Sequence, residues 1–380
     1  MFKFTTFCQP ILRFFPKKVN KKDEILFNPP DFAQETIPEN KLKQLYQNNS
    51  DLIIKLINNN QLDRNYIRNE GEQNERYFYH YLAKILKQEI FTAREKLGEE
   101  YIACYQDSLL NSNFTIEPTK GIAITSFQNY PTFQAALTEA EEIIKIRKDN
   151  DVPSKGSLDF LATSKKDFDN NSAITKLALD PNLVIPITRY FGCLPILFGF
   201  DINRARSKKI LKWSSHLYHL DPEDIKQIKV FIYLTDVDKN SGPFTALPAD
   251  KSKIVVKKLN YKIGRLSDKE VSKIVGKRVE KICLGEQGTM IFCDTNTCLH
   301  YGGRIKETER YVLTIYYALP TSTWFPLFPG DGDPRNLTPL LKASENNELE
   351  KALLGAEFLL PDQLALSRYE ELKKWVTKIK

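Results

Sequence analysis

Helical spacing of apolar residues marks the two ends of the chain. One such pattern covers about 41–110, a second spans roughly 132–148 with Pro131 near its start, and a third is expected at about 345–378. Lys and Glu fill most of the remaining positions in the first pattern. These patterns predict helices before and after the middle of the chain.

After about residue 182 the pattern changes to short runs of β-branched and aromatic residues. The predicted strands are Leu194–Phe200, Ile228–Thr235, Thr289–Cys293 and Arg310–Leu319. Turn signals separate them, at Asn240-Ser241-Gly242-Pro243, Gly285, Gly288 and Gly302-Gly303. Strands this short predict a barrel or sandwich rather than a doubly wound sheet.

The most apolar stretch runs from Leu183 to Phe200 and contains Pro186, Arg189 and Pro195. A charge and two prolines favour a buried strand region over a membrane span. We expect a mixed α+β fold, with one β-core wrapped by N- and C-terminal helices. The expected parts of this single structural domain are an irregular and helical region at 1–115, the core at 116–325 and a helical extension at 326–380.

Composition places the chain among soluble globular proteins, because 42% of its 380 residues are apolar and 27% are charged. The six cysteines show no CxxC spacing, which indicates reduced and mostly buried thiols, Cys293 and Cys298 among them. The N-terminus lacks the uninterrupted apolar region and cleavage site of a signal peptide. The expected location is therefore the cytoplasm.

A net charge of +7 is modest and does not establish nucleic-acid binding. The segment 251–281 nevertheless carries eleven Lys or Arg against three acidic residues, and it includes a predicted helix from Ser267. A solvated surface is the favoured interpretation. A basic insert near a site could also steer a phosphorylated, CoA-linked or nucleic-acid substrate. The oligomeric state is left open.

Candidate metal ligands lie in the β-rich part, which holds three of the four histidines. His219 and Asp221 stand two residues apart, so in a strand their side chains share one face. His300 follows the predicted strand at 289–293. Two imidazoles and a carboxylate can bind Fe(II) on one face and leave positions for a bidentate co-substrate and O2. An HxD triplet alone often arises by chance, whereas this ordered set is much rarer.

Arg310 lies ten residues after His300. Antiparallel pairing after the Gly302-Gly303 turn is expected to bring it back beside the metal. There its guanidinium can hold the distal carboxylate of a keto acid through two parallel hydrogen bonds.

Several runs resemble the phytanoyl-CoA dioxygenase family. They are Tyr218-His219-Leu220-Asp221-Pro222-Glu223-Asp224, Lys229 to Asp238, Asn240-Ser241-Gly242-Pro243-Phe244, Gly288-Thr289 and Leu299-His300-Tyr301-Gly302-Gly303. The resemblance covers about 190–320. It implies a double-stranded β-helix (jelly-roll, cupin-like) core and hydroxylation coupled to release of succinate and CO2. It also implies that His219, Asp221 and His300 bind Fe(II) and that Arg310 anchors 2-oxoglutarate.

Two positions refine this expectation. Halogenases of the family replace the carboxylate ligand with a small residue, so Asp221 favours hydroxylation or a related oxidation. Some members place a hydroxyl residue two positions after the distal histidine to help hold 2-oxoglutarate, but Gly302 occupies that position here. Tyr233 is the candidate for the second contact, although an ordinary packed aromatic residue fits this position equally well.

The substrate is expected to be a small organic or acyl/CoA-type molecule that the sequence does not identify. Two alternatives stay open. One is a cupin-like metal protein that does not turn over 2-oxoglutarate, and the other is a binding module that has kept the barrel and lost catalysis.

Overall fold

The computed structural model describes residues 83, 88–150, 152–155, 158–206, 215–261, 264–325, 340 and 347–355. Within these ranges two antiparallel β-sheets and a set of helices account for the regular structure. Most of the helical pattern at 41–110, and most of the one at 345–378, lies outside the described residues.

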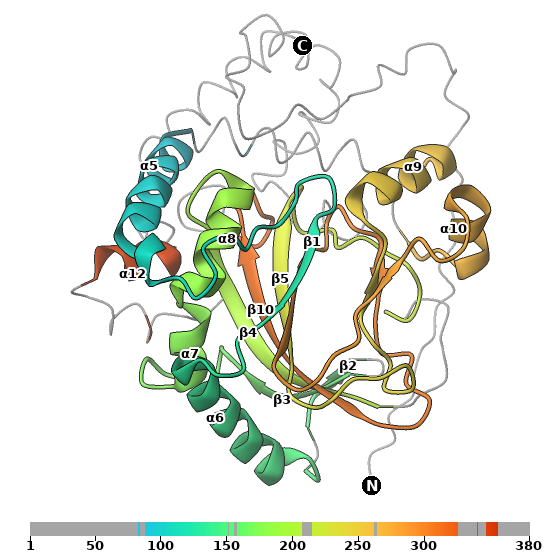
Figure 1. The fold of residues 1–380 in the computed structure, drawn as a ribbon, viewed down its shortest axis with the longest axis horizontal. Helices are drawn as coiled ribbons and strands as arrows, with labels where there is room; N and C mark the ends of the chain where they lie inside the picture. Colours follow the sequence, from blue (N-terminus) through green and yellow to red (C-terminus); the bar gives the residue numbers. More distant parts are fainter. Residues whose placement is uncertain are drawn as a thin grey trace, which may run out of the picture.

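A seven-stranded antiparallel sheet forms the larger wall of the core, in the order β1-β8-β5-β10-β4-β3-β2 (Figure 1). Its strands are β1 (Ile122–Ser126), β2 (Ser154–Lys155), β3 (Leu158–Thr163), β4 (Ile196–Ala205), β5 (Gln227–Tyr233), β8 (Thr289–Asp294) and β10 (Arg310–Ala318). Every residue of β8 is buried, which explains why its central residues, 290–293, are all apolar and show no alternation with polar ones. The four strands expected from the sequence are confirmed within a few residues at their ends.

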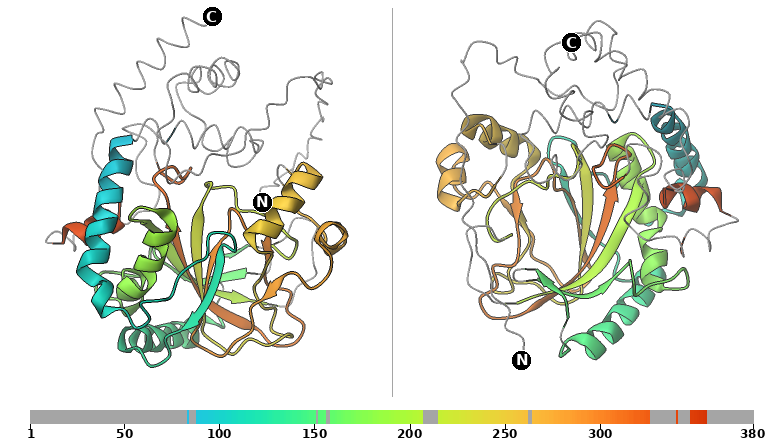
Figure 2. Two further views of the ribbon diagram at one scale, coloured as in Figure 1. Left: turned by 45° about the horizontal axis from the view of Figure 1, so that its top comes forward. Right: turned by 180° about the vertical axis from the view of Figure 1, so that it is seen from behind.

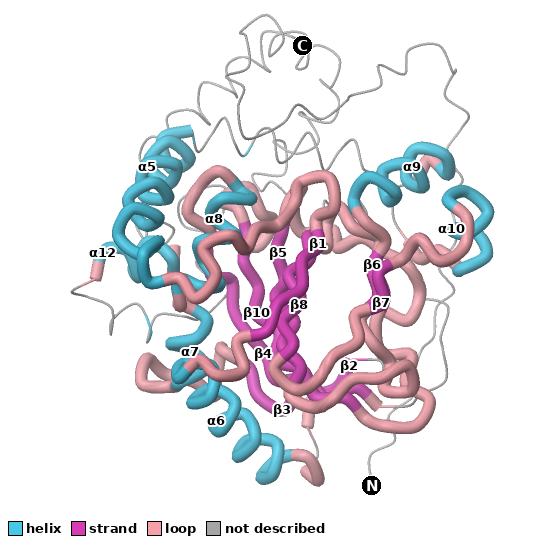
Figure 3. Tube along the Cα trace, viewed as in Figure 1, coloured by secondary structure: helices cyan, strands magenta, loops and turns pink. Residues whose placement is uncertain are grey.

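A smaller sheet in the order β7-β6-β9 lies across from the large one (Figure 3). Its strands are β6 (Thr245–Ala246), β7 (Lys281–Ile282) and β9 (His300–Tyr301). One apolar cluster joins the two sheets, since it contains Tyr233 and Val312 of the large sheet with Ala246 of the small sheet. Two facing antiparallel sheets of this kind form the predicted double-stranded β-helix, or jelly roll.

The register decides which side chains face the interior between the sheets. In β5, Ile228, Val230 and Ile232 belong to the outer apolar cluster that the helices cover. The alternate residues Lys229, Phe231 and Tyr233 therefore face inward.

Helices cover the outer face of the large sheet (Figure 2). They are α5 (Gln88–Tyr105), followed by the short helix η1 (Gln106–Ser108), α6 (Pro131–Arg147), α7 (Ala173–Ala178) and α8 (Pro181–Phe191). The helix predicted at 132–148 is confirmed as α6, which buries Phe133, Ala136, Leu137 and Ala140. None of the helices that the structure describes is long and apolar enough to cross a membrane.

Arg94 on α5 joins the N-terminal and C-terminal parts of the fold. Its guanidinium is buried and donates to the carbonyl oxygens of Leu194 at 2.9 Å, Pro195 at 2.7 Å and Ala352 at 2.9 Å. Ala352 belongs to α12 (Glu348–Leu353), which falls within the predicted C-terminal helical region. The described helices from the two ends of the chain thus pack side by side.

The expectation of a strand region across 183–200 is wrong for its first half, which forms α8. Asp180 caps this helix by accepting a hydrogen bond from the Asn182 amide, Pro181 is its first residue, and Gly192 ends it at a φ of 76°. Nearly all residues of α8 are buried. An apolar run buried on nearly all sides has few polar positions to mark a helical period, so its capping residues are the clearest signal that distinguishes it from a strand.

The basic segment forms two helices beside the small sheet, α9 (Ala249–Leu259) and α10 (Asp268–Val275). Ser267 caps α10 in a capping box with Glu270, which confirms the helix predicted from Ser267. Several lysines of these helices are exposed: Lys253, Lys257, Lys258, Lys269 and Lys273. The expectation of a solvated basic face is confirmed for these residues.

Candidate metal centre

His219 and Asp221 lie on an extended segment that crosses from the small sheet toward the end of β8. The backbones of His219 and His300 exchange two hydrogen bonds of 3.0 Å each, and the Asp221 amide donates to the Thr295 carbonyl at 2.9 Å. The sequence analysis treats this segment as a strand, but it makes isolated bridges instead of a regular strand. Its extended backbone still directs both side chains to one side, as predicted.

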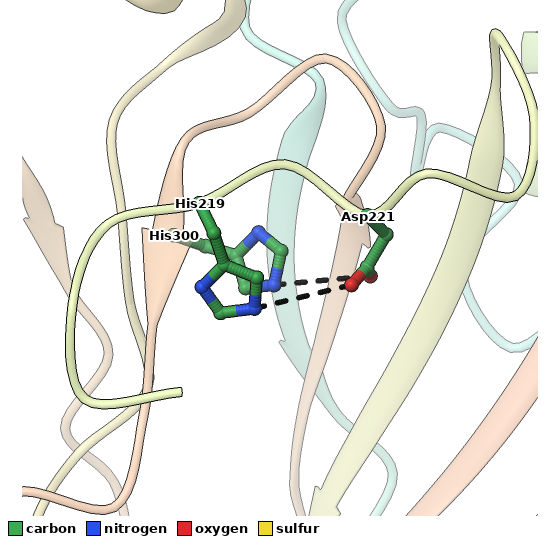
Figure 4. A group of neighbouring side chains, drawn as sticks. All are labelled: His219, Asp221 and His300. Atoms are coloured by element: carbon green, nitrogen blue, oxygen red, sulfur yellow. Dashed lines mark ion pairs between the residues drawn. The ribbon is translucent and has the colours of Figure 1, made fainter. Parts of the chain in front are cut away.

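The three predicted ligands converge, because one ligand atom from each of His219, Asp221 and His300 lies within 4.8 Å of the other two (Figure 4). The Asp221 carboxylate faces both imidazoles: Oδ1 is 3.9 Å from Nε2 of His219 and Oδ2 is 3.8 Å from Nε2 of His300. The two imidazole rings are 4.3 Å apart between centroids. Three donor atoms therefore surround one point from one side.

Backbone carbonyls fix how both imidazoles are turned. Nδ1 of His219 is 2.9 Å from the Leu217 carbonyl, and Nδ1 of His300 is 3.0 Å from the Cys298 carbonyl. The tautomer that donates from Nδ1 leaves the Nε2 lone pair of each ring directed toward Asp221. Burial lowers the pKa of both histidines, although Asp221 acts in the opposite direction. Neutral imidazoles are the form that binds a metal ion.

Lys229 is a component of this centre that the ligand motif does not include. Its Nζ lies 2.7 Å from Oδ2 of Asp221, and the side chains are 17% and 11% exposed. Burial alone would raise the pKa of Asp221, but Lys229 and the two histidines outweigh it and lower that pKa. The sequence does hold a signal, since Lys229 interrupts the apolar residues of a strand that is buried on both faces.

Arg310 is the first residue of β10 and is buried. Its Nη1 donates to the Gly242 carbonyl, and its Nη2 would lie 3.5 Å from a Cβ placed on Gly302. Within the described part of the chain, its Nε has no hydrogen-bond partner. The sequence analysis expects antiparallel pairing after the Gly302-Gly303 turn to place Arg310 beside the metal. This expectation is wrong, because β9 and β10 belong to different sheets and do not pair. The guanidinium nevertheless lies beside the segment that carries His300.

No protein-family model matches the chain, and no curated protein matches it in sequence. Among solved structures, the non-heme alpha ketoglutarate dependent epimerase SnoN from nogalamycin biosynthesis has 14% identity and a TM-score of 0.36, covering 58% of this chain and 82% of SnoN. HygX from Streptomyces hygroscopicus, solved with nickel and 2-oxoglutarate, has 12% identity and a TM-score of 0.36, covering 55% and 86%. EctD from S. alaskensis, solved with 2-oxoglutarate and 5-hydroxyectoine, has 15% identity and a TM-score of 0.38, covering 52% and 72%. These similarities are too weak to assign a reaction.

Tyr233 faces the interior, next to the Arg310 guanidinium, whose Cζ is 5.9 Å from the centre of the Tyr233 ring. Its hydroxyl donates to the Cys283 carbonyl at 2.7 Å and accepts from the Phe244 amide at 3.2 Å. Burial raises the pKa of Tyr233 to about 12. These two contacts are both to backbone, which gives the residue a structural role in addition to the predicted contact with 2-oxoglutarate.

The third histidine of the β-rich part, His216, is buried but does not belong to the metal group among the described residues. Its carbonyl accepts a hydrogen bond from Nε of Arg304 at 2.6 Å. Cys293 and Cys298 are buried free thiols, as predicted. His80 lies outside the described residues.

Proposed function

We propose that the protein is an Fe(II)- and 2-oxoglutarate-dependent dioxygenase of the kind that the phytanoyl-CoA dioxygenase resemblance implies. One observation carries this proposal: His219, Asp221 and His300 converge inside a jelly roll whose interior also holds a buried arginine. The proposed substrate is a small organic or acyl/CoA-type molecule.

The donor set fits Fe(II). Two neutral imidazoles and one carboxylate, all on one side of a point, are the ligands of non-haem Fe(II) oxygenases that keep positions open for other molecules. The hydrogen bonds from Nδ1 to Leu217 and Cys298 support this use, because a histidine ligand commonly donates its other N–H to a carbonyl or carboxylate. His219, Asp221 and His300 would hold the ion.

Arg310 fits the role of a carboxylate anchor. A buried guanidinium needs hydrogen-bond acceptors, and the structure gives it the Gly242 carbonyl while its Nε is unmatched within the described residues. A carboxylate would supply acceptors in the planar geometry that arginine binds best. The missing side chain at Gly302 leaves room beside Nη2. We propose Tyr233 as a second contact, next to this guanidinium.

When bound, iron and 2-oxoglutarate would use O2 to supply an oxidant, with release of succinate and CO2. The chain's own part is to hold both molecules in a fixed geometry and to keep the site away from bulk water. The ligand residues suit this part, since His219 is 7% exposed and His300 is 6% exposed. Asp221 leaves no room for a halide at its position, so we propose hydroxylation or a related oxidation.

Spectroscopy without oxygen tests the proposal before any substrate is known. Adding Fe(II) and 2-oxoglutarate to the wild type should produce a weak visible charge-transfer band. Arg310→Ala should weaken 2-oxoglutarate binding by about ten-fold or more, because a buried charge-assisted pair is lost. Arg189→Ala, which removes an exposed arginine on α8, is the matched control and should leave the band unchanged.

The rival functions predict other results. A metal-dependent cupin that does not use 2-oxoglutarate would bind metal through His219 but show no band. A binding module would release no succinate with any substrate and would keep its partner binding in His219→Ala.

We also propose a cytoplasmic location, since the cysteines that the structure describes are all free thiols.

A further inference from the structure

Lys229 stands at a position where the fold offers little reason for a lysine. It faces the interior from β5, opposite Tyr316 of β10 and Cys293 of β8, and its inward neighbour along the strand is Phe231. Lysine is rarely buried without a partner, because its ammonium loses hydration. The position therefore calls for a specific function.

The ammonium of Lys229 has one close charged partner, the metal ligand Asp221, at 2.7 Å from Nζ to Oδ2. Its Nζ also lies over the ring of Tyr316, 5.2 Å from the ring centre. Two further carboxylates, Glu223 and Asp201, also attract the ammonium. Lys229 is thus fixed next to the one anionic ligand of the centre.

A positive charge in this place changes the charge that the centre presents. Two neutral histidines and one carboxylate leave +1 on a divalent ion, and the ammonium in contact with Asp221 adds a positive charge directly beside that ligand. This added charge attracts a dianionic keto acid on the ion, although Glu223 and Asp201 offset part of it. The same ammonium repels a divalent cation and draws electron density from Asp221, which weakens this carboxylate as a ligand.

We propose that Lys229 is a positioning residue that acts through Asp221, lowering the affinity of the centre for its cation and raising its affinity for the anionic co-substrate. This inference rests on the proposed function. It makes Lys229 the counter-charge that adapts the three ligands to a dianion.

The test compares Ni2+ affinity, and then 2-oxoglutarate affinity of the Ni2+ form, by isothermal titration calorimetry of the full-length protein. In Lys229→Met, Ni2+ should bind about ten-fold more tightly and 2-oxoglutarate about ten-fold more weakly. Lys229→Arg keeps the charge and should change both constants less than three-fold. Lys226→Met is the matched control, because Lys226 contacts the Tyr190 ring instead of Asp221, and it should change neither constant.

The opposite signs separate this role from a structural one. A loss of packing in Lys229→Met would weaken both affinities together, and that result, or no change in either, would overturn the inference. If Lys229→Met does not fold, Lys229→Gln is measured in its place, with the thermal midpoint recorded for every variant. A wild type that binds neither Ni2+ nor 2-oxoglutarate would instead refute the proposed function itself.

Discussion

At the residue scale, the proton state of the two histidines decides whether the centre is ready for a metal. Burial is the largest influence and lowers the pKa of both His219 and His300 from the ordinary 6.5. A charge on His300 lowers the pKa of His219 further. The Asp221 carboxylate acts in the opposite direction and raises the pKa of both histidines. The net direction favours the neutral form of both rings at pH 6.5, where an exposed histidine is half protonated.

This direction predicts that metal binding releases few protons at pH 6.5. Two ordinary histidines would together release about one proton per ion at that pH, because each is half protonated. We expect less than one proton from this centre, because both pKa values are lowered. The measurement is calorimetry of Ni2+ binding at pH 6.5 in buffers with different ionisation enthalpies, and release of a full proton would contradict the lowered pKa values.

The same shifts have a consequence for stability without metal. Below pH 6.5 the unfolded chain takes up protons at these histidines more readily than the folded chain does, so the free energy of unfolding decreases as the pH decreases. The stabilisation that they contribute is fully present above pH 6.5 and is lost as the pH decreases below it.

The contact between Lys229 and Asp221 shows at this scale what the sequence could not predict, although the buried position of the lysine is itself a signal. The ligand residues follow a spacing that can be recognised without a structure, but the contact between Lys229 and Asp221 depends on how the segment at 219–221 crosses the start of β5. That path is set by hydrogen bonds between distant parts of the chain, such as the one from Asn296 Nδ2 to the Asp221 carbonyl at 2.8 Å. Local sequence patterns do not report such contacts.

At the element scale, Tyr233 ties β5 to the residues around the small sheet. Its hydroxyl contacts the Cys283 carbonyl after β7 and the Phe244 amide before β6. The side chain is fully buried, so neither backbone group can turn to water if the hydroxyl is removed. One side chain thus helps to hold the two walls of the jelly roll together.

Tyr233→Phe should therefore lower the free energy of unfolding by about 2 kcal/mol. For a chain of this size that corresponds to a decrease of about 2–4 °C in thermal midpoint. Tyr311→Phe is the control, because Tyr311 is half-buried and its hydroxyl donates a long hydrogen bond of 3.4 Å to the exposed side chain of Glu309. An unchanged midpoint together with weaker 2-oxoglutarate binding would mean that the hydroxyl serves the co-substrate alone.

Elements with a clear period or clear caps could be predicted from the sequence, and elements without them could not. The amphipathic helix α6 and the capped helix α10 lie where they were expected. The sequence of α8 suggests a strand, because its residues are apolar and buried on nearly every side. The Gly302-Gly303 turn suggests that β10 forms a hairpin with the segment that carries His300, but β10 pairs with β4 and β5 instead.

At the scale of the whole molecule, the jelly roll explains how side chains far apart in sequence meet. His219 and His300 come from the side of the small sheet, whereas Arg310 begins the central strand of the large sheet. The β-core and its flanking helices were predicted, because alternating strands and periodic helices are local patterns. The assignment of each strand to one of two sheets was not, because it depends on pairing over long distances.

The central claim is that His219, Asp221 and His300 bind one metal ion and that Arg310 faces the co-substrate bound there. Diffraction from crystals grown without oxygen with Ni2+ and 2-oxoglutarate, measured at the nickel absorption edge, tests it most directly. We predict one anomalous peak within bonding distance of all three residues, with the distal carboxylate of 2-oxoglutarate on the Arg310 guanidinium. A peak elsewhere, or none at this position, would contradict the account.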